Sequence, residues 1–305
     1  MIFGVSADTL SGITMIAADK AEGYQEQVLK SLGRLPPFSP VLNRLIATLS
    51  QEDASFVKIS DLIEKDTVLA GNILRLVNSA LYARRGTVNS VRHAVSLLGI
   101  DKLRNATLSM SIFRMWNNVR TPPGWSMARF NLHSVAVAIL ADLIAQRARI
   151  QYPEGAFIAG LFHDIGRLLI AVGLRDEFAE IETLYQAGDK TLCACETDIL
   201  GWAHPNLSAQ ALTSWNLPEP IRNAVRYHHV PDEDPTPKDT SEIPLSRLLW
   251  TVDQYVNSTG ATISATLSGA DAPNAHAIEK LPIAAELPDV LHEFQVEFDV
   301  IRGMF

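Results

Sequence analysis

A histidine and an aspartate stand side by side in the segment GLFHDIGRLLI, which runs from Gly160 to Ile170 and is otherwise small or apolar. Burying a charged Asp164 in such surroundings costs free energy unless an opposite charge meets it. The candidates are an ion pair with Arg167, a metal ion, or a helix surface that is wetter than its composition indicates. The group that balances the charge of Asp164 therefore determines most of the function prediction from sequence.

Further histidines and a second acid stand on predicted helix faces that are apolar. Imidazole nitrogens and carboxylate oxygens are natural ligands of Fe, Mn, Zn and Ni. Seven such ligands exceed what one tetrahedral ion binds, and they suit a pair of divalent transition-metal ions that activates a bridging water. The alternative is a core in which each histidine donates a hydrogen bond to a backbone carbonyl. The candidate metal ligands are His133, His163, Asp164, His204, His228, His229 and Asp253.

Two adjacent pairs bear on how these ligands are held. We expect His163 and Asp164 to share one continuous helix, where neighbouring side chains cannot point at the same spot. The carboxylate would then bridge two metals while the histidine holds one of them. His228 is expected to continue the apolar face of its helix, with His229 turned by about 100° on that helix. Gly160 and Gly166, three residues to either side of His163, would allow a neighbouring helix or an ion to approach closely.

Helical periodicity runs through nearly the whole chain, so the predicted fold class is all-α, a packed multi-helix protein. Proline- and glycine-rich segments such as LGRLPPFSP and RTPPGWS separate the predicted helices. We divide the chain into an N-terminal extension (1–30), an N-terminal helical subdomain (31–120), a helical subdomain with the His/Asp cluster (121–256) and a C-terminal helical extension (257–305). The acidic segment HVPDEDPTPKDTSEIP is predicted to be an exposed connection, either a lid or a long loop.

The bulk composition narrows the function classes. A formal charge of −8 and a pI near 5.5 argue against nonspecific binding to nucleic acid or to anionic membranes. No run approaches 18 apolar residues, so we expect a cytoplasmic protein that does not enter the membrane. In that compartment Cys193 and Cys195 are expected to be reduced thiols. Its oligomeric state is left open.

Two smaller signals have two interpretations each. Arg84 and Arg85 belong either to a solvated turn or to a contact with an anionic partner. Trp202 and Trp215, on either side of the His204 segment, belong either to the core or to a nucleotide pocket. In each case the solvated turn or the core is favoured.

Several segments resemble a known superfamily. GLFHDIGRLLI resembles the signature of the HD superfamily of metal-dependent phosphohydrolases, and DTVLAGNILRLVNSALY with AVSLLGIDKLRN resembles the N-terminal part of an HDOD domain. HPNLSAQALTSWNLPEPIRNAVRYHH and the acid in LLWTVDQY continue the pattern, so the resemblance covers about Leu32 to Val256. It implies an all-α, HD-superfamily-like bundle, a bacterial origin and a regulatory role in signalling, with a hydrolase site that is mostly lost in this family.

This sequence differs from family members in which the hydrolase site is lost. Compared with the HD-GYP branch, which hydrolyses cyclic di-GMP, all seven candidate ligands match metal-ligand positions. The Gly-Tyr-Pro element after the HH pair is missing, however, and the lysine that commonly follows HDIG is Arg167. The resemblance therefore favours a non-catalytic signalling protein with a retained metal cluster and a protein or nucleotide partner. The alternative is a metal-dependent phosphohydrolase, a phosphodiesterase acting on a nucleotide or cyclic dinucleotide, in which Asp164 and Arg167 would be catalytic.

Overall fold

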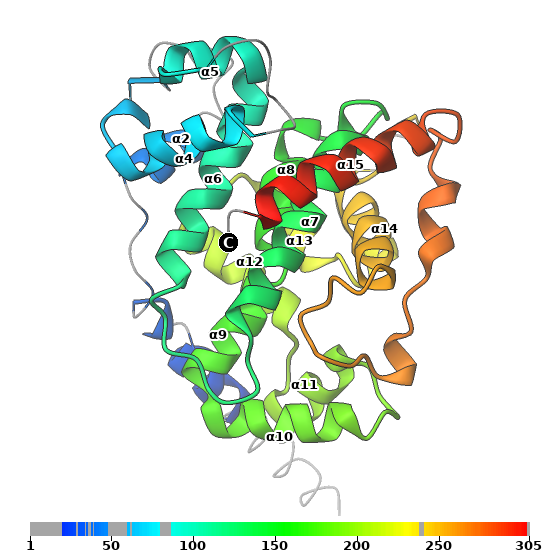
Figure 1. Ribbon diagram of the computed structural model, residues 1–305. Helices are drawn as coiled ribbons and strands as arrows, with labels where there is room; N and C mark the ends of the chain where they lie inside the picture. Colours follow the sequence, from blue (N-terminus) through cyan, green and yellow to red (C-terminus); the bar gives the residue numbers. More distant parts are fainter. Residues whose placement is uncertain are drawn as a thin grey trace, which may run out of the picture.

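The computed structural model describes residues 20–28, 30–33, 35, 38, 40–47, 60, 61, 63–79, 87–237 and 241–303 (Figure 1). Within these ranges the chain forms helices and no strand, and an isolated β-bridge joins Ile150 to Ile243. The all-α prediction is therefore confirmed. Arg84 and Arg85 lie outside the described residues.

The helices follow one another with short connections. Their order is α2 (Pro40–Ala47), α4 (Thr67–Val77), α5 (Val91–Leu98), α6 (Ile100–Trp116), α7 (Met127–Ala145), η2 (Pro153–Gly155), α8 (Ala156–Phe162), α9 (Ile165–Gly173), α10 (Arg175–Gln186), α11 (Leu192–Leu200), α12 (His204–Ser214), α13 (Glu219–Arg226), η3 (Pro231–Glu233), α14 (Leu245–Ser258), η4 (Gly269–Asp271), η5 (Ala275–Lys280) and α15 (Leu287–Arg302).

Helix α7 lies at the centre and packs against α8, α14 and α15 (Figure 1). Most of its 19 residues are buried, because apolar side chains surround it on nearly every face. The hydroxyl of Ser126 accepts a hydrogen bond from the backbone N–H of Arg129 and caps its first turn. This helix supplies the wall on which the rest of the centre is built.

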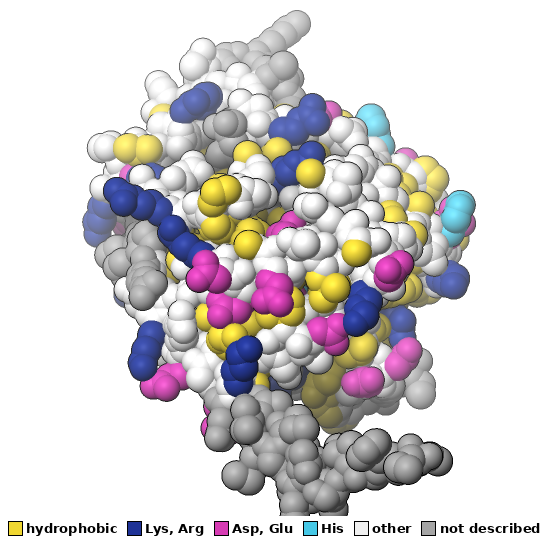
Figure 2. Space-filling model, turned by 90° about the horizontal axis from the view of Figure 1, so that it is seen from below, with side chains coloured by type: hydrophobic (Ala, Val, Ile, Leu, Met, Phe, Trp, Pro, Cys, Tyr) yellow, Lys and Arg dark blue, Asp and Glu magenta, His cyan; other side chains and the backbone are white. Residues whose placement is uncertain are grey.

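Two stretches, 127–145 and 153–173, are long and apolar enough to cross a membrane by length and composition. In the structure, 72% and 89% of these windows are buried, so their apolar side chains face other helices, as in a protein core. The face seen in Figure 2 carries acidic and basic side chains interspersed with small hydrophobic areas. No continuous basic field covers the described residues of that face.

The N-terminal helices α4, α5 and α6 pack on one another and form the upper left part of Figure 1. The predicted helical periodicity is confirmed in α4, where Leu69, Ile73 and Leu76 are buried. A proline-rich connection then separates α6 from α7, as the sequence indicates. The ring of Trp116 at the end of α6 lies 5.3 Å from that of Phe130, so the two helices share one core.

Both ends of the described chain pack back onto the central helices. Gln27 donates a hydrogen bond to the carbonyl oxygen of Gly173 at the end of α9. Helix α15 lies along α7, and its Glu293 forms ion pairs with Lys102 of α6 at 2.8 Å and with Arg147, two residues after the end of α7, at 2.5 Å. The predicted boundary at 120/121 lies in the α6–α7 connection and that at 256/257 lies inside α14, so the division into subdomains stays a prediction.

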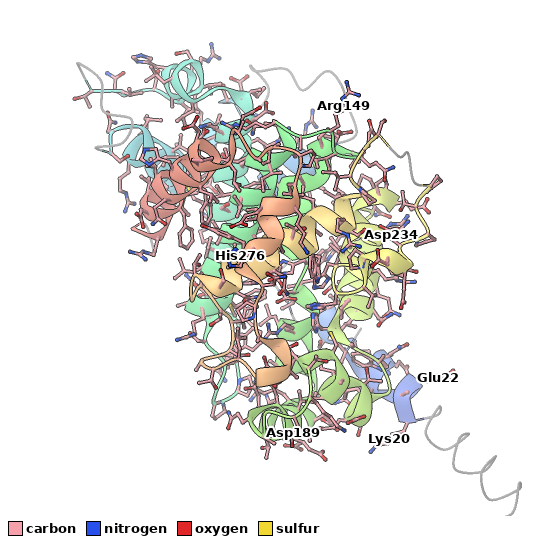
Figure 3. The ribbon with its side chains drawn as sticks, turned by 90° about the vertical axis from the view of Figure 1, so that its right-hand side faces the viewer. Lys20, Glu22, Arg149, Asp189, Asp234 and His276 are labelled. Atoms are coloured by element: carbon pink, nitrogen blue, oxygen red, sulfur yellow. The ribbon has the colours of Figure 1, made fainter. Side chains whose placement is uncertain are left out.

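The acidic segment after His229 is only partly exposed. Asp234, labelled in Figure 3, is buried and accepts a hydrogen bond from the backbone N–H of Thr236. The carbonyl oxygen of Pro237 accepts a bond from Gln151. The carbonyl oxygen of Ile243 accepts a bond from the backbone N–H of Gln151, so residue 151 holds the segment on both sides of residues 238–240, which lie outside the described part.

The two tryptophans that flank the His204 segment pack as core residues. Trp202 is buried and donates its indole N–H to the carbonyl oxygen of Ala21. Trp215 packs its ring against Phe38 and Phe162, with centroid distances of 4.6 and 5.4 Å. Their favoured interpretation as core residues agrees with these contacts.

Close packing at one glycine gives a test of the helix arrangement. A Cβ atom on Gly160 would lie 2.7 Å from the Cα of Ala138 in α7, while one on exposed Gly71 would meet nothing within 4 Å. We expect Gly160→Ala to lower the free energy of unfolding by about 1–3 kcal/mol through overpacking. Gly71→Ala in the interior of α4 should raise it by about 0.5–1 kcal/mol. Urea unfolding measures both, and equal effects of the two variants would contradict the packing of α8 on α7.

Candidate metal centre

All seven predicted ligands lie together at the centre of the bundle. Six of the seven side chains are almost fully buried, and His229 is half-buried. Helices α7, α12 and α14 carry one of them each, and the rest stand where α8 and α13 end. The seven positions are His133 in α7, His163 and Asp164 between α8 and α9, His204 at the first residue of α12, His228 and His229 after α13, and Asp253 in α14.

Both predictions of a continuous helix through an adjacent pair are wrong. Helix α8 ends at Phe162, and α9 begins at Ile165, with Asp164 at φ −101° and ψ 13° between them. Helix α13 ends at Arg226, so His228 and His229 also lie beyond a helix end, with ring centroids 4.1 Å apart. Leaving the helix frees neighbouring side chains from the 100° separation and lets both members of a pair face one centre.

Hydrogen bonds fix the orientation of the imidazoles. The Nδ1 atoms of His133, His163 and His228 lie 2.6–2.7 Å from the carbonyl oxygens of Ala261, Gly160 and Val225, in that order. A carbonyl only accepts, so each Nδ1 carries a proton, and in the neutral ring each Nε2 holds a lone pair. The alternative to a metal centre, a core of histidines bonded to backbone carbonyls, therefore accounts for one nitrogen of each ring. The other nitrogen of each ring faces inward.

The inward Nε2 atoms form two groups, which share Asp164. Its Oδ2 lies 3.9 Å from His133 and 3.7 Å from His163, and its Oδ1 lies 3.1 Å from His204 and 3.6 Å from His228. The first group also contains Asp253, whose Oδ1 is 3.2 Å from His133. We name these the 133/163/253 group and the 204/228/229 group.

Within each group, nitrogen atoms face nitrogen atoms at short range. Nε2 of His133 lies 3.3 Å from that of His163, and Nε2 of His204 lies 3.1 Å from that of His229. Two lone pairs in such contact repel unless a proton or a metal ion lies between them. Oδ1 of Asp164 and Nε2 of His228 are both buried and have no hydrogen-bond partner among the described residues. These groups have the donor atoms, spacing and burial of sites that bind transition metals.

Electrostatics favour the ligand forms of several members. Burial would raise the pKa of the two carboxyls, but the surrounding histidines and Arg167 hold the pKa of Asp164, and the histidines that of Asp253, well below the usual range. Burial lowers the pKa of His228, and that of His229 falls well below its usual value. Carboxylates and neutral imidazoles are the species that coordinate metal ions.

Two further residues contact the ligands, and the sequence analysis did not single them out. Glu196 of α11 is buried, and one of its oxygens accepts hydrogen bonds from both the backbone N–H and Nδ1 of His204. Asn257 donates to Asp253 at 2.9 Å from one helical turn away. Both signals are visible in the sequence: an acid within the apolar stretch TLCACETDIL and an amide four residues after the acid in α14.

Arg167 is held at the edge of the centre. Its Nη1 pairs with Oδ2 of Asp164 at 3.2 Å, and its Nη2 donates to the hydroxyl of Ser264 at 2.9 Å. The ion pair that the sequence offers as an alternative to a metal is therefore present. It engages one oxygen of Asp164 and leaves the other facing the 204/228/229 group.

A cavity with a volume of about 350 Å³ opens beside the centre. Asp164, His204 and His229 form its inner end, and Trp250 and Asp271 belong to the remaining wall. Its size falls at the lower end of the roughly 300–1,000 Å³ range of small-molecule sites. A small molecule in this cavity would reach the 204/228/229 group directly.

The charge on His204 gives a pH-dependent test in metal-free protein. Burial would lower the pKa of His204, but Glu196 and Asp164 outweigh it and raise that pKa to about 9. A raised pKa stabilises the fold below the unfolded value of about 6.5, and this stabilisation is lost as pH rises through about 9. We expect the free energy of unfolding to fall by up to about 3 kcal/mol across that window, and by less in Glu196→Gln.

Urea unfolding at several pH values after chelation measures this dependence. His276→Ala is the matched control, because the side chain of His276, labelled in Figure 3, is 81% exposed on η5. Its pH profile should equal that of the unchanged protein. An unchanged slope in Glu196→Gln would contradict the assignment.

Comparison with known proteins agrees with this architecture. The family model of the HDOD domain matches residues 35–231. A crystal structure of an HDOD domain protein of unknown function from Geobacter sulfurreducens superposes with a TM-score of 0.73 at 23% identity, covering 92% of this chain and 98% of that one. A Shewanella amazonensis protein provisionally named a phosphohydrolase gives 0.67 at 22% identity, covering 91% and 97%.

Two other relatives are longer than the region they share with this chain. A Marinobacter aquaeolei protein provisionally named a signal transduction protein gives a TM-score of 0.67 at 22% identity, with 93% of this chain and 65% of that chain covered. An uncharacterized protein of Treponema pallidum is 23% identical over 197 residues, which span 64% of this chain but 37% of that protein. The helical fold is shared across these structures, and on the family match over residues 35–231 the chain belongs to the HDOD domain family.

Proposed function

We propose that the protein is a non-catalytic regulator of bacterial signalling whose core holds a pair of divalent transition-metal ions. The observation that carries the proposal is the convergence of inward-facing imidazole nitrogens on the two oxygens of buried Asp164. The donor set fits Fe, Mn, Zn or Ni. We place the protein in the cytoplasm, where it would act through a signalling protein or a nucleotide.

The metal ions would be structural in this proposal. The ligands come from α7, the α8–α9 junction, α12, the end of α13, and α14. Ions at both groups would therefore tie five parts of the bundle together. Because an unfolded chain has no such preformed site, the free energy of metal binding becomes free energy of folding. A partner that shifts these helices would change the affinity of the centre for its metal ions. By thermodynamic linkage, the metal ions would change the affinity for the partner by the same factor.

Three features favour regulation over hydrolysis. Arg167 is engaged by Asp164 and Ser264, so it is not free to clamp a phosphate. Asp271, which is not among the predicted ligands, also lines the cavity and opposes entry of an anionic substrate. The Gly-Tyr-Pro element is replaced by Val230 and the residues after it. The Marinobacter relative, provisionally named a signal transduction protein, points the same way.

Metal analysis tests the proposal directly. Protein purified without chelator should contain between about one and two equivalents of transition metal, the number that two ligand groups can hold. His133→Ala should lower this content and the melting temperature, whereas His276→Ala, at an exposed position on η5, should change neither. Chelation should lower the melting temperature of the unchanged protein. Less than about a tenth of an equivalent of metal would overturn the proposal.

A metal-dependent phosphohydrolase is the second candidate, because the cavity borders Asp164, His204 and His229. Bound ions would there supply a metal-activated water for hydrolysis. The chain's own residues would orient a phosphodiester in the cavity, with Arg167 released from Asp164 to meet its charge. The Shewanella relatives, provisionally named phosphohydrolases, give this candidate its support.

Incubation of metal-loaded protein with cyclic di-GMP and with bis(p-nitrophenyl) phosphate separates the two candidates. We expect no turnover above that of the Asp164→Ala variant, since the variant lacks the carboxylate shared by both groups. Turnover in the unchanged protein that disappears in Asp164→Ala would establish hydrolysis and reject the non-catalytic role. Product formation is followed by chromatography and by absorbance.

A further inference from the structure

A second cavity lies between α7, residues 259–262 and α15, and it shares no lining residue with the cavity at the metal centre. Its volume is about 380 Å³, within the size range of sites for small molecules. Its walls are Arg129, Leu132, Thr259, Gly260, Ala261, Thr262, Phe294, Gln295, Phe298 and Arg302. The proposed function does not use this space.

The cavity is basic in a chain whose formal charge is −8. Arg129 and Arg302 both line it, and no carboxylate does among the described residues. Arg129 donates through Nη1 to the hydroxyl of Thr262 and to the carbonyl oxygen of Ser264, which position its guanidinium without neutralising it. Arg302 lies 3.6 Å from Asp299 in a solvent-exposed pair, which is weak and easily exchanged for another anion.

Next to these cations the wall is aromatic. The rings of Phe294 and Phe298 lie nearly parallel, at an angle of 12° with centroids 5.7 Å apart. Both side chains are held by the packing of α15 on α7, and both border the cavity. Phe294 and Phe298 are only 4% and 8% exposed, so a small part of each ring borders the cavity, and a flat ring packed on that part adds an aromatic contact to the burial of apolar area.

We propose that this cavity binds a mononucleotide, with its phosphate at Arg129 and Arg302 and its base against Phe294 and Phe298. Guanidinium groups recognise phosphate through paired, charge-assisted hydrogen bonds. The hydroxyls of Thr259 and Thr262 donate to the carbonyl oxygens of Val256 and Ser264, so the hydroxyl of Thr259 can only accept from a ligand. The combination of two cations and an aromatic wall selects an organic anion with a flat ring over a simple inorganic anion.

A residue in the wall of this cavity connects it to the metal centre. Ala261 lines the cavity, and its carbonyl oxygen accepts the Nδ1 proton of His133 at 2.7 Å. A ligand at the cavity therefore contacts the segment that orients a predicted metal ligand. Binding itself depends on α7, α15 and residues 259–262, and does not require that a metal be present.

Calorimetric titration of the protein as purified, with AMP and with GMP, tests the proposal. For a ligand of this size we expect a Kd on the order of 10 µM for at least one of them. Inorganic phosphate and adenosine, which each carry half of the recognised chemistry, should bind at least about tenfold more weakly. No binding of either nucleotide up to about 1 mM would overturn the proposal.

Substitutions of the two arginines test whether the nucleotide binds in this cavity. Arg129→Gln and Arg302→Gln should each weaken binding by at least about tenfold. Arg302 is exposed near the end of α15, so its replacement leaves the core intact. Arg75→Gln removes the same charge from the exposed face of α4, where Arg75 donates to Asn72, and should leave binding unchanged.

Two results would assign the nucleotide to another place and reject the site. One is equal affinity in Arg302→Gln and the unchanged protein. The other is binding that disappears on chelation, which would put the ligand at the metal centre. Protein that is purified without chelator, contains less than about a tenth of an equivalent of metal and still binds AMP or GMP through Arg129 would reject the proposed function and support this site.

Discussion

The buried carboxylate of Asp164 is the constraint on which the rest of the structure depends. Its two oxygens face imidazole nitrogens from two sides, and Arg167 meets one of these oxygens from a third. A carboxylate in this setting stays charged only if positive charge surrounds it, and removing one partner of such a cluster is more costly than never having built it. The packing of the helices must therefore place their ends so that these side chains face Asp164.

That requirement explains features that look unrelated along the chain. Gly166 brings α9 against α12, since a Cβ there would lie 2.2 Å from the carbonyl oxygen of His204. The same contact keeps Asp164, which directly precedes α9, beside His204, which is the first residue of α12. Glu196 then fixes the ring of His204 from behind. Small residues, helix ends and a buried acid thus serve one purpose, which is to hold ring nitrogens at a fixed distance from a carboxylate.

The sequence predicts the residue types of this centre better than its geometry. Apolar periodicity and the Pro/Gly breaks indicate the helices, and histidines on apolar faces stand out against them. The interruption at Asp164 could not be predicted, because GLFHDIGRLLI keeps a helical pattern and holds no proline. It results from the packing of Gly166 on α12, a contact between residues about 40 apart in sequence. Glu196 was missed because an acid on a short helix usually faces solvent, and its burial depends on α12.

The part of the chain beyond the family match completes this arrangement. The match ends at residue 231, yet α14 supplies Asp253, and the segment after it supplies the carbonyl oxygen of Ala261 that orients His133. Arg129 and Arg167 both hold this segment through Ser264, one from α7 and one from α9. Residues 259–264 are therefore bonded to the centre on one side and border a basic, aromatic cavity on the other. A displacement of this segment would alter the orientation of His133 and, through Ser264, the bond that holds Arg167 beside Asp164.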